Sequence, residues 1–171
     1  MAVTESPGAS RALYLLNGIP DRFNDFCHMD QMTFIQLADW IVEHAHSNNS
    51  PEISVEESLF VFLDIVAQGN SFRTAAIDWE HDVKLTQSIF FSVLNALHIL
   101  HEKEDISPSC PSITKSKSQW RVLKTWRPDR SRADGKLRIG DADGDGLLVS
   151  RESLEQALTA LNNFIYHCRE S

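Results

Sequence analysis

Apolar residues recur at helical spacing along most of the chain from about residue 10 to residue 103. Asp30 stands where a side chain can cap the start of a helix, and the Asn-Asn-Ser-Pro run at 48–51 breaks the pattern after it. The apolar positions of this predicted helix lie three or four residues apart: Phe34, Leu37, Ala38 and Ile41.

The next predicted helix has the clearest start. Ser54 and Glu57 have the spacing of a capping box, in which the serine oxygen and the glutamate carboxylate each accept a backbone N–H. The run Leu-Phe-Val-Phe-Leu-Asp-Ile-Val that follows is apolar nearly all round. We therefore expect this helix to be the central, most buried one, with Gly69 as its C-terminal stop.

Two further helices are predicted, a short one over about 71–79 and a long one over about 85–101, with a turn at 80–83 between them. Strand signals are nearly absent. The sequence therefore predicts an all-α fold, a helical bundle with a helix-turn-helix-like element, followed by a C-terminal loop and helix. The expected organisation is as follows: 1–9 disordered, 10–103 a helical domain, 104–139 a basic linker rich in proline and serine at its start, and 140–168 the loop and helix. We expect residues 10–105 to fold without the tail.

The most specific chemical pattern is the dodecamer 141–152, Asp-Ala-Asp-Gly-Asp-Gly-Leu-Leu-Val-Ser-Arg-Glu. Alternate carboxylates can converge on one hard cation if the chain turns sharply, and Gly146 permits that turn. The pattern resembles an EF-hand calcium loop, with Val149 as a tolerable departure at position nine. The expected Ca²⁺ ligands are Asp141, Asp143, Asp145, the carbonyl of Leu147, and a bidentate Glu152. The alternative is an acidic, glycine-rich turn that binds nothing.

Only one side of this loop has the expected flank. The residues after it predict an exiting helix with an apolar stripe, which consists of Leu154, Leu158, Leu161 and Ile165. We expect this stripe to be a surface for a protein partner or for self-association. The residues before it, 127–140, are interrupted by Pro128, Gly135 and Gly140, and they predict no entering helix.

Charge is unevenly distributed. The chain has a net charge of −8, yet nine basic residues lie between 115 and 138 against two aspartates, which makes this segment about +7 and the rest about −15. A solvated basic linker is one interpretation. Weak, non-specific nucleic-acid binding is the other, with Trp120 and Trp126 available to stack on bases. Its candidate contacts are the following: Lys115, Lys117, Arg121, Lys124, Arg127, Arg130 and Arg132.

Several functional classes lack their signatures. No long apolar run or signal peptide is recognised, and the three cysteines are widely spaced, so we expect an intracellular protein, cytoplasmic or nuclear, that contacts no membrane. His98 and His101 have no third metal ligand at a fixed spacing. No catalytic or nucleotide-binding fingerprint is present, and the expectation is that the protein is not an enzyme.

Residues 53–97 and the preceding Met-Asp-Gln-Met-Thr-Phe-Ile-Gln-Leu-Ala-Asp-Trp-Ile resemble the helical N-terminal domain of Harbinger-type transposase-derived nucleases. The resemblance covers about 21–103 and implies a helix-turn-helix-like domain that assists DNA binding. This chain has Gln87, Ser88 and Ile89 where that family has a basic residue, and the 70 or so residues that follow hold no comparable nuclease domain. Ca²⁺ binding is therefore the expected function, and a nucleic-acid-binding remnant without nuclease activity is the alternative.

Overall fold

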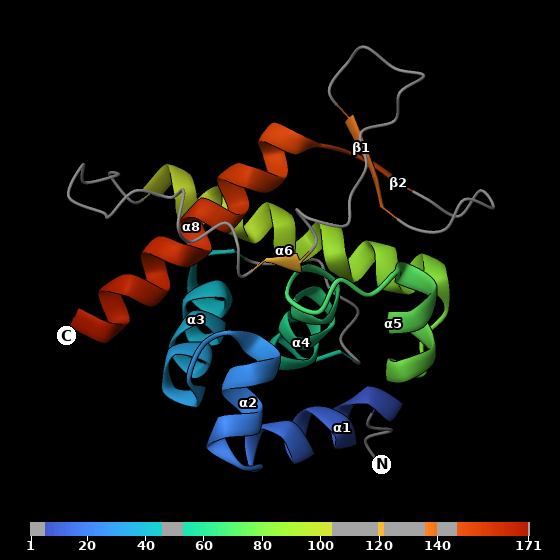
Figure 1. The fold of residues 1–171 in the computed structure, drawn as a ribbon, viewed down its shortest axis with the longest axis horizontal. Coiled ribbons are helices and arrows are strands. Elements are labelled where there is room, and N and C mark those ends of the chain that lie inside the picture. The colour runs from blue at the N-terminus through green and yellow to red at the C-terminus, as the bar shows by residue number, and fades with distance from the viewer. Residues whose placement is uncertain (1–5, 46–52, 104–119, 122–135, 140–146, 171) are drawn as a thin grey trace.

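The computed structural model describes residues 6–45, 53–103, 120–121, 136–139 and 147–170. Within these residues the fold is all-α, as predicted, with one small two-stranded sheet near the C-terminus (Figure 1). The elements in chain order are α1 (Pro7–Leu16), α2 (Pro20–Cys27), α3 (Gln31–His44), α4 (Val55–Val66), α5 (Phe72–Trp79), α6 (Val83–Lys103), β1 (Lys136–Ile139), β2 (Leu147–Ser150) and α8 (Arg151–Glu170).

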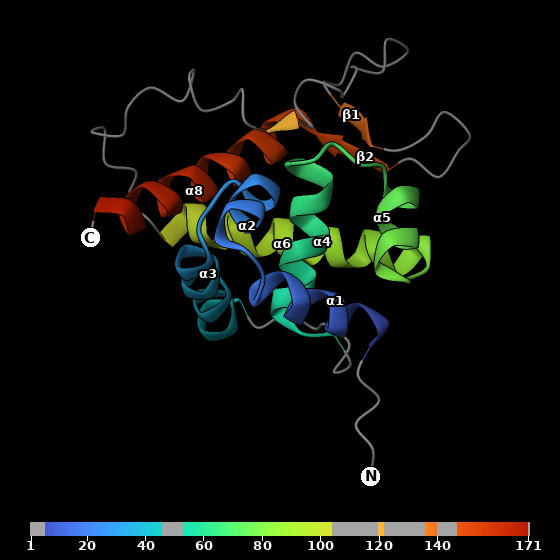
Figure 2. The ribbon, with the colours of Figure 1, turned by 60° about the horizontal axis from the view of Figure 1, so that its bottom comes forward.

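Helix α4 is the centre of the molecule, as its apolar sequence predicted. Every residue from Glu57 to Val66 is buried, and the helix contacts α1, α2, α3, α5 and α6. Figure 2 shows it upright near the centre of the molecule, with α1 below it, α2 to its left and α6 crossing behind it. A helix enclosed on all sides can contain a charged residue only if that residue is paired, which becomes important for Glu57 and Asp64.

Side-chain caps explain where the central helices begin. Asp30, Ser54 and Ser71 each accept the backbone N–H three residues later, at 2.7, 3.2 and 3.1 Å respectively. After α4 the chain turns at Gly69, whose φ of 76° lies in the left-handed region that glycine reaches without a Cβ clash. The predicted starts of α3 and α4 and the predicted stop near Gly69 are confirmed.

The core continues from α4 through α6 to α8. Helix α6 packs against α4 and α5 on one side and against α8 on the other, and α8 also contacts α3. The apolar stripe of α8 is buried in the same cluster as the core of the helical body, and this stripe consists of Leu154, Leu158, Leu161 and Ile165. Helix α6 is long and apolar enough to cross a membrane by length and composition, a test that buried core helices also pass.

Three predictions from the sequence change, two on boundaries and one on the surface of α8. Residues 7–9 belong to α1 rather than to a disordered start, because Pro7 suits the first helical turn. The last four residues of the predicted basic linker form β1, so one two-stranded sheet interrupts the otherwise helical fold. The stripe expected to serve a partner is covered within the chain by α6 and α3. The division into a body and a tail stays a prediction, but the described residues of both share one core.

Candidate functional site

The C-terminal hairpin positions the predicted calcium loop. β1 and β2 are antiparallel, with Lys136 opposite Ser150 and Ile139 opposite Leu147. Since Ile139 and Leu147 are Cα partners, the seven residues 140–146 connect two ends that lie side by side. Short connections between paired ends cost little closure entropy. β1 precedes the predicted loop at the place where an EF-hand has its entering helix, and the sequence of that flank predicted no helix there.

Two of the predicted ligand positions fall in described residues, one at the start of β2 and the other just after its end. Leu147 is the first residue of β2, and Glu152 is the second residue of α8, with an exposed side chain. Glu152 makes no ion pair or hydrogen bond with any residue that the structure describes, whereas the neighbouring Arg151 pairs with Glu155 at 3.0 Å. The other three predicted ligands, Asp141, Asp143 and Asp145, lie outside the described residues.

The start of α8 is fastened to the helical body directly after Glu152. His98 Nε2 on α6 lies 2.7 Å from Ser153 Oγ, within hydrogen-bond distance. Burial lowers the pKa of His98, and the charge of His101 lowers it further, while Glu102 opposes both effects. The neutral imidazole is therefore favoured, and the contact between His98 and Ser153 links α6 to α8.

The basic segment is only partly described. Trp120 is fully buried, its indole N–H donates to Asn162 Oδ1 at 3.0 Å, and its ring meets His28 edge-on. It is therefore not available to stack on a base, contrary to what its position among cations suggested. Arg121 is exposed. The remaining predicted nucleic-acid contacts lie outside the described residues, as does Trp126: Lys115, Lys117, Lys124, Arg127, Arg130 and Arg132.

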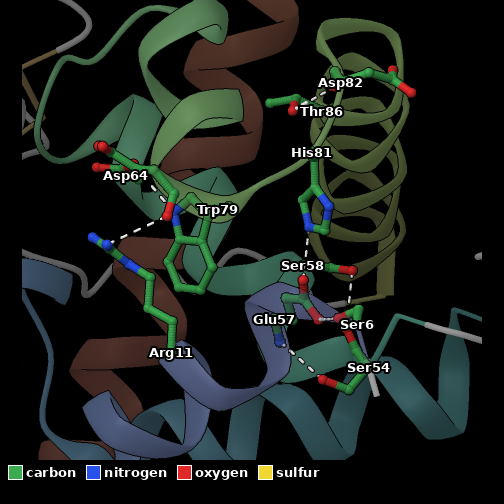
Figure 3. Close-up of polar contacts among 11 residues, drawn as sticks. Ser6, Arg11, Ser54, Glu57, Ser58, Asp64, Trp79, His81, Asp82 and Thr86 are labelled. Atoms are coloured by element: carbon green, nitrogen blue, oxygen red, sulfur yellow. Dashed lines mark hydrogen bonds and ion pairs between the residues drawn. The ribbon is translucent and has the colours of Figure 1, made fainter. Parts of the chain in front are cut away.

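A buried polar network joins α1, α4 and the turn before α6 (Figure 3). Glu57 is completely buried, accepts the hydroxyl of Ser6, and lies 2.7 Å from Nε2 of His81, which is 4% exposed. A Cβ at Gly8 would overlap the Glu57 carboxylate, so glycine is required there for α1 to approach. The predicted capping box is half correct: Ser54 accepts the N–H of Glu57, but the Glu57 carboxylate turns to α1 and His81 instead.

A second buried carboxylate lies about two helical turns further along α4. Asp64 accepts hydrogen bonds from Asn70 Nδ2 at 2.6 Å and from the indole of Trp79 at 3.2 Å, as Figure 3 shows for Trp79. Burial raises the pKa of Asp64, and these two hydrogen bonds partly offset that rise. Sequence reasoning overlooked Asp64 and gave Glu57 only a capping role, although a charge in an apolar run is itself the signal of a buried pair.

Neither network has the order needed for covalent catalysis. In a nucleophile–base arrangement the imidazole contacts the hydroxyl, whereas here the Glu57 carboxylate stands between Ser6 and His81. The carboxylates of Glu57 and Asp64 are also buried. Burial raises the pKa of the Cys27 thiol strongly, which disfavours the thiolate that a nucleophile needs. Among the described residues no group of three or more metal-ligating side chains comes together.

The described residues define an all-α protein with one two-stranded hairpin before its last helix. The family model described as Domain of unknown function (DUF8040) matches residues 5–99, more than half of the chain, and the protein belongs to that family. The match extends from α1 almost to the end of α6 and stops before the hairpin and α8. Neither the curated proteins nor the solved structures contain a match to this chain.

Proposed function

We propose that the protein binds Ca²⁺ through residues 141–152, with Asp141, Asp143, Asp145, the Leu147 carbonyl and Glu152 as ligands. The observation that carries the proposal is the position of Glu152. Its carboxylate is exposed and unengaged by any described residue, and it stands in the first turn of α8, where a twelfth-position EF-hand ligand belongs.

The hairpin supports the same function. Three aspartates at alternate positions can converge only if their segment turns back, and the pairing of Ile139 with Leu147 brings the two ends of that segment, 140–146, side by side. β2 is already paired with β1 of the same chain, so its strand needs no second calcium-binding loop to pair with. Negative charge at the N-terminus of α8 is also favoured by the helix dipole.

Isothermal titration calorimetry of the intact chain with CaCl₂ tests the proposal. Because a strand replaces the entering helix, we expect a weak site, with a dissociation constant on the order of 10⁻⁵ to 10⁻³ M. The same titration with MgCl₂ should give weaker binding, since Mg²⁺ demands a tighter octahedral shell. Glu152→Gln removes one of the bidentate oxygens as an anionic ligand and should weaken Ca²⁺ binding by at least about tenfold.

Glu155→Gln is the matched control. It removes the same charge from the same helix three residues later, where the carboxylate is already paired with Arg151. We expect its calcium isotherm to stay close to that of the parent. Identical isotherms for the parent and the Glu152→Gln variant would contradict the assigned ligand set.

Nucleic-acid binding by a remnant of a Harbinger-type transposase-derived protein is the second candidate. It is favoured by the cationic segment 115–138, which carries about +7 in an otherwise acidic chain. The burial of Trp120 removes one of its two expected stacking residues. We therefore rank it below calcium binding, as a non-specific electrostatic contact.

A further inference from the structure

Helices α1 and α2 form a groove on the outside of the family domain, well away from the C-terminal hairpin (Figure 1). The groove has a volume of about 400 Å³. Its rim contains Leu13, Tyr14 and Ile19, which are 52%, 73% and 57% exposed, and its floor contains the buried Phe23. Three large apolar side chains exposed together around one hollow are typical of an interaction surface.

The groove is held in shape by contacts beneath and beside it. The Phe23 ring packs edge-on against Phe34 and Phe60, so the floor belongs to the core. The turn between the two helices is tied down by Gln31, whose side-chain amide donates to the carbonyl of Leu16 at 2.9 Å and to that of Gly18 at 3.3 Å. A surface already ordered before binding loses little conformational entropy when a partner arrives.

The charge of the groove indicates the partner's chemistry. Arg22 is the one charged residue in its lining, is exposed, and makes no ion pair or hydrogen bond with any residue described by the structure. Arg11, nearby in sequence, is occupied by the carbonyl of Asp78 and the ring of Trp79. An unpaired guanidinium beside apolar side chains is complementary to a carboxylate carried by an apolar segment.

We propose that the α1–α2 groove docks an amphipathic helical segment of another protein, with apolar residues over Phe23 and Tyr14 and a carboxylate opposite Arg22. The largely exposed rim would leave most of a small molecule in water, whereas enclosed ligand sites bury most of theirs. A second copy of this chain would bring two Arg22 side chains towards each other across an isologous contact. Helix-in-groove docking uses apolar anchors at helical spacing, which suits a groove between two helices.

Fluorescence anisotropy with two labelled peptides tests this proposal on the intact chain. Both peptides are amphipathic helices of leucine, alanine and glutamine, and they differ only in one residue, Glu or Lys, beside the apolar stripe. We expect the Glu peptide to bind about tenfold more tightly, because an opposite charge replaces a like charge at Arg22. This preference is opposite to the one that the protein's net charge of −8 would produce. Arg22→Glu should reverse it, and Tyr14→Ser should weaken both peptides.

Two exposed substitutions outside the groove serve as controls. Lys84→Glu on α6 changes charge as Arg22→Glu does, and Ile77→Ser on α5 removes an apolar side chain that is 71% exposed. Both should leave the peptide preference unchanged. Equal binding of the two peptides, or a reversal by Lys84→Glu, would overturn the proposal. So would sedimentation showing a dimer that Tyr14→Ser dissolves, or Tyr14-dependent binding to phosphatidylcholine vesicles, since these assign the groove to a second copy or to a lipid surface.

Discussion

At the scale of single residues, two buried acids decide how the helices around α4 are joined. Glu57 binds the start of α1 and the turn before α6, and Asp64 binds Asn70 and Trp79. A buried carboxylate without partners is very unfavourable, so each acid fixes the positions of its neighbours as firmly as apolar packing does. Hydrogen bonds to a carboxylate are directional, whereas apolar contacts are not.

Glu57→Ala should lower the free energy of unfolding by roughly 3–5 kcal/mol, because it leaves the buried imidazole of His81 and the half-buried hydroxyl of Ser6 without their shared partner. Urea denaturation followed by circular dichroism measures this change. Glu56→Ala removes a neighbouring carboxylate in the same helical turn and should change stability by no more than about 0.5 kcal/mol. Combining Glu57→Ala with His81→Ala should cost less than the two single changes added together; additive losses would show that the pair does not interact.

His98 should make the fold sensitive to acid. Its pKa is lower in the folded chain than the ordinary value of 6.5, so the unfolded chain binds more protons between those two values. Stability is therefore full above pH 6.5 and falls as the pH is lowered through 6.5 towards the folded pKa. Asp64 acts in the opposite sense at lower pH, because its raised pKa makes the folded chain bind more protons as carboxylates titrate.

Thermal melts between pH 7.5 and 5 in EDTA, for the parent and for His98→Gln, separate this effect from the rest. Glutamine keeps a hydrogen-bonding group near Ser153 but does not titrate, so the fall in melting temperature over this range should be shallower in the variant. His167→Gln, at an exposed position near the end of α8, should melt like the parent at every pH. A parallel pH profile for His98→Gln and the parent would rule out His98 as the titrating group.

At the scale of elements, the helices could be predicted from sequence but their partners could not. Caps and apolar spacing placed the starts of α3, α4 and α5 because these signals are local. The docking of α8 on α6 joins residues that are far apart along the chain, such as His98 and Ser153, and periodicity shows only that a helix has an apolar face. The return of the Glu57 carboxylate to α1 escaped prediction for the same reason.

Because α8 shares the core, a chain that ends at residue 105 should not reach native stability, contrary to the expectation from sequence. Its α6 would expose side chains that α8 now covers, and their loss from the core is equivalent to removing several buried apolar contacts. We expect this truncated chain to melt well below the intact protein and to bind a hydrophobic dye. A cooperative melt at the parent temperature would restore the prediction of an independent body.

At the scale of the whole molecule, charge opposes the second candidate function. With six phosphate contacts from the basic segment, the log–log slope of duplex DNA affinity against salt should be about −5, and the dissociation constant should be no tighter than about 10⁻⁶ M at physiological salt. Replacing Arg127, Arg130 and Arg132 with glutamine should abolish what binding there is. A gel shift showing nanomolar, sequence-selective binding would place DNA recognition ahead of calcium. The candidate site was predictable to the extent that spacing encodes ligands. The burial of Trp120, and a Glu152 carboxylate without a partner among the described residues, depend on tertiary contacts.

Helix α8 packs against α3 and α6 of the family domain, residues 5–99, and therefore binds this domain as an intramolecular partner. Residues 104–119 join the end of α6 to Trp120, and a covalent connection raises the effective concentration at which two segments meet. A chain cut within 104–119 should therefore still give two fragments that associate through Trp120 and α8, but only above a threshold concentration. The same arrangement would allow α8 to be exchanged by gene fusion. A fused helix with a matching apolar stripe should be able to cover the same face of α6 and α3.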